Sequence, residues 1–322
     1  MILFGTNDVG PAKYLASLAR IFDQKIFFKC SSLNYFVFKE YKSEIIDDYS
    51  RYDFDIVVTG TSLGQSIDKE LIIWAKERHI PSISIVEHWS WYRKRFLLND
   101  KYIFPDYIIL NDKFALKEAV IDGLDKNILF PLGNPYLEEL SNRNINVFEK
   151  EKYYISNKIP KNKRIILFIS ESLCGPLALE LGYDEYQVIS SLKRILSKND
   201  FLIIKTHPEE NISKYNIFQD DSTKIISENL TPEFLSILGD KIIGMASMLL
   251  LEISFFRKDI ISFRPNSKKQ FIGQKLGVTN DAVNIEELKI LLNTNINTNF
   301  NLKDHFKFSA KNIREFILSK ML

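Results

Sequence analysis

Short apolar segments that alternate with helical patterns constrain the fold of this chain most. Between these segments lie helical patterns such as Asp68–Arg78, Lys113–Asp122 and Tyr186–Ser197. Strands that alternate with helices through short loops predict parallel sheets covered by helices on both faces. We therefore expect an α/β fold with a parallel sheet in each half. The predicted strands are Met1–Phe4, Lys25–Lys29, Phe54–Val58, Ser82–Val86, Ile108–Leu110, Leu129–Leu132, Arg164–Ser170, Phe201–Thr206, Lys224–Ser227, Lys241–Gly244 and Ile260–Phe263.

The length of 322 residues and one polar segment predict two domains. Asn142–Lys163 is rich in Asn and Lys and contains Pro160, which is typical of a link between domains. We expect an N-terminal domain at 1–150 and a C-terminal domain at 151–322. The terminal helix 306–321 is expected to be able to pack back on the N-terminal domain.

Charge and cysteine content exclude several classes of partner. The chain has 43 basic and 41 acidic residues, a net charge of +2, so nucleic acid is not the expected partner. Cys30 and Cys174 form no CxxC pair, which indicates neither a disulfide framework nor a zinc site. No signal peptide and no apolar run of about 18 residues is found. We expect a cytoplasmic protein without a transmembrane segment, and peripheral contact with the inner face of the membrane stays open.

The segment Phe201–Ile204 is apolar and is followed by Lys205-Thr206-His207-Pro208. Pro208 has no N–H to donate and favours extended geometry at His207. Ligands of open α/β sheets bind at the carboxyl edge of the strands. One cation and two hydrogen-bonding groups at that edge suit a phosphate. The alternative is a capped strand end whose Lys and His are solvated.

Two polar loops follow predicted strands of the first half. Asp8 lies in the turn Gly5–Pro11, which is neither GxGxxG nor a P-loop, and a tight strand-to-helix turn is the alternative. Thr61 and Ser62 follow the strand Phe54–Val58 and are expected to contact an acceptor molecule bound at that edge. These side chains are expected to meet at one sheet edge.

A third loop, Glu87–Phe96, is the densest chemical group of the first half. Glu87 and His88 follow the strand Ser82–Val86, and we expect Glu87 first, His88 second and Asp8 third as a general base. Aromatic side chains near basic ones suit a sugar or a phosphorylated acceptor. The expected acceptor-binding residues here are Trp89, Tyr92 and Arg95. In the alternative, Trp89, Trp91 and Phe96 pack a helix onto the sheet while the charges point outward.

The second half offers further candidates at strand ends. Ser170 and Glu171 end the strand Arg164–Ser170. Ser247 stands near a helix start, where a cap, free N–H groups and the helix dipole favour an anion. Glu252 lies in an otherwise apolar helix, where a carboxylate is seldom without a partner. The alternatives are a purely structural cap at Ser247 and pairing of Glu252 with Arg257 or Lys258.

Two α/β halves with these motifs resemble the GT-B glycosyltransferases. Lys205-Thr206-His207-Pro208 resembles the HP motif of members that use cytidine-nucleotide donors in surface-polysaccharide synthesis. Gly244-Met245-Ala246-Ser247 with Glu252 resembles the family's donor loop and following helix. The resemblance implies two Rossmann-like domains that face each other across a cleft. It assigns donor phosphate to His207 and Ser247 and ribose to Glu252.

The activity implied is metal-independent, inverting transfer of a sugar from a CMP- or CDP-linked donor to a hydroxyl of a glycan or lipid-linked acceptor. No cofactor is expected, because the nucleotide-sugar is the substrate. The Asp/Glu-Asp/Glu-Gly element that supplies the base in the sialyltransferases is missing. The UDP-sugar 2-epimerases share the architecture, so an epimerase is an alternative, and so is a non-catalytic binding partner. If the carboxyl edges face each other, residues of both halves would line one crevice.

Overall fold

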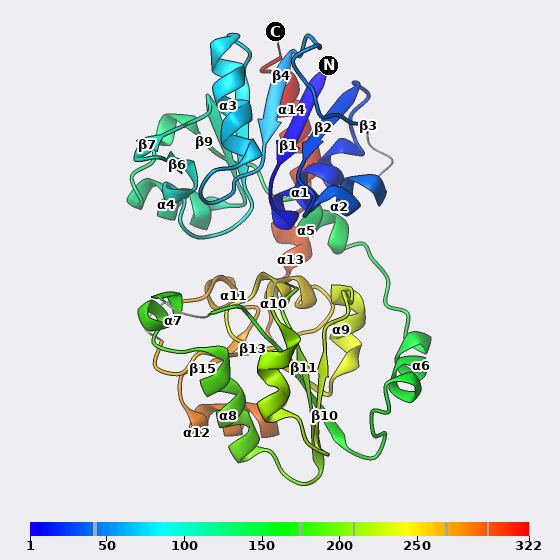
Figure 1. Ribbon diagram of the computed structural model, residues 1–322. Coiled ribbons are helices and arrows are strands. Elements are labelled where there is room, and N and C mark those ends of the chain that lie inside the picture. The colour runs from blue at the N-terminus through cyan, green and yellow to red at the C-terminus, as the bar shows by residue number, and fades with distance from the viewer. Residues whose placement is uncertain (41–43, 174–175, 209, 268–269, 295, 322) are drawn as a thin grey trace. The chain divides into compact units, whose positions relative to one another are not determined.

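The computed structural model describes residues 1–40, 44–173, 176–208, 210–267, 270–294 and 296–321 (Figure 1). The chain forms two compact units, each built around its own sheet. Unit 1 comprises Met1–Glu139 and Asp304–Leu322, and unit 2 comprises Leu140–Lys303. Cys174 lies outside the described residues. No helix in the described part of the chain is both long and apolar enough to span a membrane.

Unit 1 contains a seven-stranded sheet in the order β3-β2-β1-β4-β5-β8-β9, with every neighbouring pair parallel. Its strands are β1 (Ile2–Thr6), β2 (Ile26–Cys30), β3 (Glu44–Ile45), β4 (Ile56–Thr59), β5 (Ser82–Val86), β8 (Tyr107–Leu110) and β9 (Leu129–Pro131), beside a hairpin of β6 (Leu97–Leu98) and β7 (Lys101–Tyr102). Its helices are α1 (Val9–Ala19), α2 (Tyr35–Glu40), α3 (Ile67–Glu77), η1 (Lys94–Phe96), α4 (Lys113–Ile121), η2 (Lys126–Ile128) and α14 (Ser309–Leu318). Two short helices, α5 (Pro135–Leu140) and α13 (Leu302–His305), cross the boundary between the units.

Both faces of the unit 1 sheet are covered because its strands are apolar on both sides. Along β1, Ile2 and Phe4 face a core shared with α1, α2 and α14. Leu3 faces the opposite core, which α3 closes with Leu71, Trp74 and Ala75. Because side chains alternate along β1, they pack against helices on both faces of the sheet.

Unit 2 repeats this topology with a six-stranded parallel sheet in the order β12-β11-β10-β13-β14-β15. Its strands are β10 (Arg164–Ile169), β11 (Asp200–Lys205), β12 (Thr223–Ile226), β13 (Lys241–Gly244), β14 (Ile261–Phe263) and β15 (Asn280–Ala282). Its helices are α6 (Phe148–Ser156), α7 (Pro176–Leu181), α8 (Glu185–Ile195), η3 (Ile212–Phe218), α9 (Pro232–Leu238), α10 (Met248–Ile253), α11 (Ile272–Lys275) and α12 (Ile285–Asn293). The predicted parallel α/β architecture of both halves is confirmed.

The two compact units divide at Glu139/Leu140, whereas the sequence predicts a boundary at residue 150. The predicted link packs as part of unit 2: Arg143 pairs with Glu233 at 3.9 Å, and the ring of Tyr153 on α6 meets Phe234 on α9 edge-to-face at 5.3 Å. The Tyr154 hydroxyl donates to the Leu238 carbonyl at 2.5 Å. The composition of this segment is typical of a link, and its residues Tyr153 and Tyr154 contact α9 of unit 2.

The terminal helix α14 belongs to unit 1, and both chain ends lie in that unit (Figure 1). Ile313 and Ile317 are buried in the core that contains β1. The ring of Phe316 lies 4.5 Å from that of Phe130. The Glu138 carboxylate accepts hydrogen bonds from the N–H groups of Phe308 and Ala310 at 2.7 and 2.8 Å. Unit 1 is therefore completed by the last residues of the chain.

Candidate functional site

Each sheet has a switch point, where successive strands are added first on one side and then on the other. In unit 1 it lies between β1 and β4, and in unit 2 between β10 and β13. Loops after such strands diverge and leave a crevice at the carboxyl edge of the sheet. The predicted residues Asp8 and Ser62 follow the first pair of strands, and Glu171 and Ser247 follow the second.

Glu87 follows β5 and has one carboxylate oxygen buried without a hydrogen-bond partner in the described chain. The other oxygen lies 3.8 Å from Nη1 of Arg95. Burial raises the pKa of Glu87 to about 7, the Arg95 guanidinium opposes this, and Asp68 and Asp8 add to it. A carboxyl group with this pKa can both accept and return a proton at neutral pH.

The other two expected bases compare poorly with Glu87. Burial, together with Arg95, lowers the pKa of His88 to about 3, and its Nδ1 lies 2.8 Å from Oγ of Ser90. Asp8 is half-buried at the start of α1, where its side chain makes no capping bond and accepts from Asn7 Nδ2 at 3.2 Å. The lowered pKa disfavours His88 as a base relative to Glu87, the first choice from the sequence.

The loop after β4 is tied to its neighbours by buried polar groups. The Thr61 hydroxyl donates to the Ile85 carbonyl at 3.2 Å, and Arg95 donates to the carbonyls of Thr61 and Ser90, each at 3.2 Å. Arg95 is only 8% exposed. Thr61 and Arg95 thus hold the loop in this structure, whereas the Ser62 hydroxyl is buried without a hydrogen-bond partner among the described residues.

The structure favours the packing alternative for Trp89 and Tyr92. Both are buried, Trp89 Nε1 donates to Asp112 at 3.0 Å, and the Trp89 ring meets that of Phe306 at 6.4 Å. The Tyr92 hydroxyl lies 3.5 Å from Glu118. Trp91, which the same alternative placed in the core, is 40% exposed. The aromatic cluster therefore serves mainly to anchor the loop after β5.

Sequence reasoning missed several buried polar residues of unit 1. Asn111 follows β8 and donates to the backbone carbonyl of Glu87 at 2.7 Å, and Asn134 after β9 donates to Asn111 at 3.1 Å. Asp68 and Lys69 at the start of α3 are each 1% exposed. The position of Asn111 after an apolar strand was a usable signal. An Asp in the first turn of a helix is too common to stand out.

The motif at the end of β11 is largely buried. The Lys205 ammonium donates to the Thr206 carbonyl at 2.7 Å, and burial lowers its pKa against the opposing charges of Glu228 and Glu210. Thr206 is 2% exposed, while His207 is half-buried and its backbone N–H donates to Glu210 at 2.8 Å. Of these three side chains, that of His207 is the most accessible.

Glu171 bonds to the loop that was expected to hold phosphate. Its carboxylate accepts a hydrogen bond from the Ala246 N–H, and the N–H groups of Ser247 and Met245 also act on it. Burial raises the pKa of Glu171 to about 7, and these N–H groups and Arg264 oppose the rise. The loop's N–H groups thus bind a carboxyl group of the protein itself in this structure.

The other residues expected to bind the nucleotide-sugar donor have structural contacts of their own. The Ser247 hydroxyl caps α10 by accepting from the Leu249 N–H at 3.1 Å. The Ser170 hydroxyl bonds to that of Tyr215, which in turn donates to Glu210. Glu252 is 9% exposed on α10. Its suggested partner Arg257 forms a two-pronged pair with Asp259 instead.

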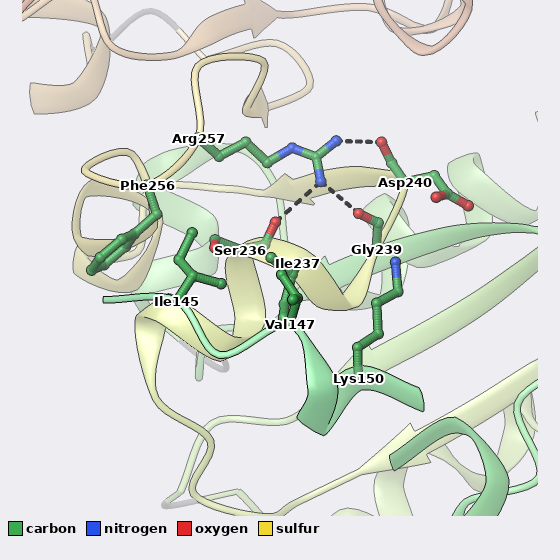
Figure 2. A pocket seen from close by; sticks show the side chains of 9 residues that line it. All are labelled: Ile145, Val147, Lys150, Ser236, Ile237, Gly239, Asp240, Phe256 and Arg257. Atoms are coloured by element: carbon green, nitrogen blue, oxygen red, sulfur yellow. Dashed lines mark hydrogen bonds between the residues drawn. The ribbon is translucent and has the colours of Figure 1, made fainter. Parts of the chain in front are cut away.

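A hollow of about 390 Å³ is lined by Arg257 and eight other residues, none of which is a predicted site residue (Figure 2). Gly239 and Asp240 precede β13, so the hollow lies at the amino edge of the unit 2 sheet. The Arg257 guanidinium donates to the carbonyls of Ser236, Gly239 and Asp240 (Figure 2). With Asp259 these acceptors use all five N–H donors of Arg257, which makes it a structural tie. Nowhere in the described ranges are three or more His, Cys, Asp or Glu grouped to hold a metal ion.

Two parallel α/β units with the same strand order and polar groups at both switch points define a GT-B-like fold. UDP-GlcNAc 2-epimerase from Methanocaldococcus jannaschii matches 99% of this chain and 100% of its own at 14% identity, with a TM-score of 0.66. The enzyme of that name from Neisseria meningitidis, bound to UDP-GlcNAc, matches 99% and 100% at 12% identity and 0.68. Anabaena Alr3699/HepE in complex with UDP and glucose matches 99% and 95% at 12% identity and 0.67. No protein-family model and no curated protein matches the sequence.

Proposed function

We propose that the protein is an enzyme that acts on a UDP-linked sugar and inverts a stereocentre of that sugar, as a UDP-GlcNAc 2-epimerase-like enzyme. The observation that carries the proposal is the likeness to epimerase structures over 99% of the chain and essentially all of theirs. The GT-B-like fold alone hosts several reactions, so the assignment also needs suitable chemistry in the chain.

Glu87 supplies chemistry that fits the proposal. Inversion at C2 by proton transfer breaks its C–H bond, and the electron pair left behind expels UDP as the C1–O bond breaks. Return of UDP to C1 and of a proton to the opposite face of C2 completes the inversion. A group that transfers this proton works best with a pKa near the working pH. The pKa of Glu87, raised by burial to about 7, meets this condition. We assign Glu87 as one proton-transfer group, with Asn111 and Arg95 holding it in place.

Unit 2 is assigned to the nucleotide in this proposal. His207 and the N–H groups at Met245–Ser247 would bind phosphate, with Ser170 beside them, and Glu252 would accept hydrogen bonds from ribose. The loop N–H groups already bind the Glu171 carboxylate, which supports their capacity to hold an anion. The phosphate of the nucleotide would take the place of this carboxylate.

An incubation of the protein with UDP-GlcNAc in D₂O tests the proposal directly. Proton NMR should show the C2 epimer accumulating and deuterium appearing at C2 of both sugars, because the re-formed C–H bond takes its hydrogen from solvent. A preparation carrying Glu87→Gln is the control for contaminating activity. Unlabelled, unconverted UDP-GlcNAc in the presence of wild-type protein that binds UDP would contradict the proposal.

Glycosyl transfer is the second candidate, and Lys205-Thr206-His207-Pro208 is the observation that favours it. This reading predicts tighter binding of CMP and CDP than of UDP, and release of the nucleotide only when a glycan or lipid-linked acceptor is present. It predicts no deuterium at C2, since transfer leaves that C–H bond intact. Competition calorimetry with the three nucleotides, together with the NMR experiment, separates the two candidates.

A further inference from the structure

Both backbone groups of His207 pair with a single residue, Glu210. The His207 N–H donates to Oε2 of Glu210 at 2.8 Å, and the His207 carbonyl accepts a hydrogen bond from the Glu210 N–H at 3.1 Å. These two bonds close a short loop directly after β11. Pro208 lies in this loop, and its fixed φ further limits the conformations that the loop can adopt. The position of His207 at the sheet edge therefore depends on where Glu210 is held.

The Glu210 carboxylate is held by side chains of η3. The Glu210 side chain is 1% exposed, and it accepts hydrogen bonds from the Lys214 ammonium and from the Tyr215 hydroxyl, which lies 2.8 and 2.9 Å from its two oxygens. The Tyr215 hydroxyl has one proton, and this proton is directed to Glu210, so the Ser170 hydroxyl at the end of β10 donates to Tyr215. The hydrogen bonds thus run from Ser170 through Tyr215 and Glu210 to the backbone of His207.

Lys214 joins this network to helix α8. Its ammonium also pairs with Glu185, whose side chain is fully buried at the start of that helix. Burial alone would lower the pKa of Lys214, but the two carboxylate partners raise it, so the ammonium keeps its charge. A buried network of this kind is rigid, and removal of one charged member is costly because the others lose their partner. The loop after β11 is therefore fixed to η3, β10 and α8 by the charge of Glu210.

We propose that Glu210 is a positioning residue of the nucleotide site, which holds His207 where its ring can bind the phosphate of the nucleotide. The proposal rests on the assignment of His207 to phosphate in the proposed function and adds Glu210 to that site. Glu210 does not itself touch the phosphate in this scheme, because a carboxylate is an acceptor and offers a phosphate no donor. It acts through the backbone of His207.

A double-mutant cycle, measured by calorimetric titration of the full chain with UDP, tests this role. Glu210→Gln keeps the shape of the side chain but removes its charge and replaces one acceptor oxygen by a donor. It should weaken UDP binding about tenfold in the wild-type background, but by less than about twofold in His207→Ala, where the ring through which it acts is already missing. Similar losses in both backgrounds, or an unaltered UDP affinity in Glu210→Gln, overturn the proposal.

The matched control is Glu151→Gln. Glu151 is also a glutamate of unit 2 that pairs with a lysine, Lys161, at 2.7 Å, but this pair is exposed. An exposed ion pair contributes little to stability, so this variant should bind UDP as the wild type does. A loss of affinity in Glu151→Gln equal to that in Glu210→Gln would show that the effect is not specific to the loop after β11, and would overturn the proposal.

A milder variant and a second measurement keep the test decisive if Glu210→Gln does not fold. Tyr215→Phe removes only the hydroxyl that donates to Glu210, and it should show the same dependence on His207 with a smaller loss. The chain has four histidines, so NMR of the histidine rings without nucleotide can identify His207 by the signal that is lost in His207→Ala. This signal should shift in Tyr215→Phe and stay in place in Glu151→Gln. A His207 signal that stays in place in Tyr215→Phe overturns the proposal.

The result can be separated from that of the proposed function, because binding of UDP requires no turnover. Losses of affinity that depend on His207, in a protein that does not convert UDP-GlcNAc, support the role of Glu210 and refute the proposed function. Losses that are independent of His207, in a protein that converts UDP-GlcNAc, do the reverse. A wild type that binds no UDP refutes both.

Discussion

At the scale of single residues, burial rather than pairing sets the chemistry of Glu87. Arg95, the cation paired with it, stands 3.8 Å away and also donates to the backbone carbonyls of Ser90 and Thr61. The pKa of Glu87 therefore rises to about 7 in spite of a neighbouring positive charge. A close two-pronged ion pair would have lowered the pKa of the carboxyl instead.

Replacing Glu87 by Gln should abolish turnover and leave the affinity for UDP within about twofold of the wild type, because the residue is assigned to the sugar and not to the nucleotide. Calorimetric titration with UDP and the NMR assay measure the two quantities. Glu77→Gln, an exposed acid on α3, is the matched control and should remain fully active. Full activity of Glu87→Gln would remove Glu87 from the proton-transfer step.

The pH dependence of stability gives a second prediction. The folded-state pKa of Glu87, about 7, lies above the ordinary 4.5, so folding disfavours its ionisation. The wild type should lose stability at this site as the pH rises from about 4.5 to 7, by at most about 3 kcal/mol. Glu87→Gln lacks this loss. Urea denaturation should therefore show that the free energy of unfolding of the variant rises relative to that of the wild type between pH 5 and pH 8. A constant difference between the two free energies would contradict the raised pKa.

His207 gives a prediction for unit 2. His207→Ala should weaken UDP binding about ten- to a hundredfold, the loss of one charge-assisted hydrogen bond of about 1.5–3 kcal/mol. Its half-buried position at the end of β11 should leave the melting temperature nearly unchanged. His79→Ala, at an exposed histidine after α3, is the control. Unaltered UDP affinity in calorimetry would exclude His207 from the nucleotide site.

At the scale of elements, the crevice between β1 and β4 depends on a close approach of two loops. A Cβ atom on Gly60 would lie 2.3 Å from Oγ1 of Thr6 and 2.4 Å from Cβ of Pro11. The loop after β4 can therefore lie against the start of α1 only because residue 60 has no side chain. The hydroxyls of Thr6 and Ser62 both lie beside the Asp68 carboxylate here.

Gly60→Ala should consequently destabilise unit 1 by about 1–3 kcal/mol through overpacking and impair activity in the protein that folds. Thermal denaturation and the NMR assay measure both effects. Gly10→Ala is the control for stability, since its Cβ would meet Glu87 at an ordinary contact distance of 3.4 Å. Equal melting temperatures for Gly60→Ala and the wild type would show that the loops can separate without cost.

At the scale of the whole molecule, unit 1 is built from both ends of the chain. Ile313 and Ile317 of α14 are fully buried against β1 and α1, so the N-terminal fold is incomplete without the last helix. Gly133 has a φ of +114°, and a Cβ atom built on it would lie 2.0 Å from the Ser309 hydroxyl. The start of α14 can therefore pack against residue 133 only because this residue has no side chain.

Ile313→Ala should destabilise unit 1 by about 2–5 kcal/mol, the usual cost of a buried Ile-to-Ala change, and leave unit 2 unaffected. Hydrogen exchange measured by mass spectrometry should show faster exchange in β1, β4 and α1, with unchanged protection in β10, β11 and β13. Ile290→Ala, at a 60% exposed position on α12, is the matched control. Equal loss of protection in both units would mean that they unfold together.

Much of the fold could be predicted from the sequence because its signals are local. Apolar runs such as Phe201–Ile204 and periodic patterns such as Asp68–Arg78 report strands and helices directly, and their alternation predicts parallel sheets. The position of Glu87 after such a run also predicted its place at a sheet edge. Among the elements that the structure describes, the two-residue β3, the hairpin, the short β15 and short helices such as α2, α5 and α6 were not predicted, because so few residues carry little pattern.

The sequence by itself determined the two α/β halves, their parallel sheets and the strand ends that carry Asp8, Glu87, Glu171, His207 and Ser247. Only the tertiary structure decided which polar side chains form hydrogen bonds with other groups of the chain. Lys205 donates to the Thr206 carbonyl, and Trp89 donates to Asp112. Glu171 accepts from the N–H of Ala246 in the loop after β13. The tertiary structure also brought α14 to β1. Strand and helix formation depends on neighbours in sequence, whereas desolvation and hydrogen-bond partners depend on residues that are distant in sequence and meet only in the folded chain.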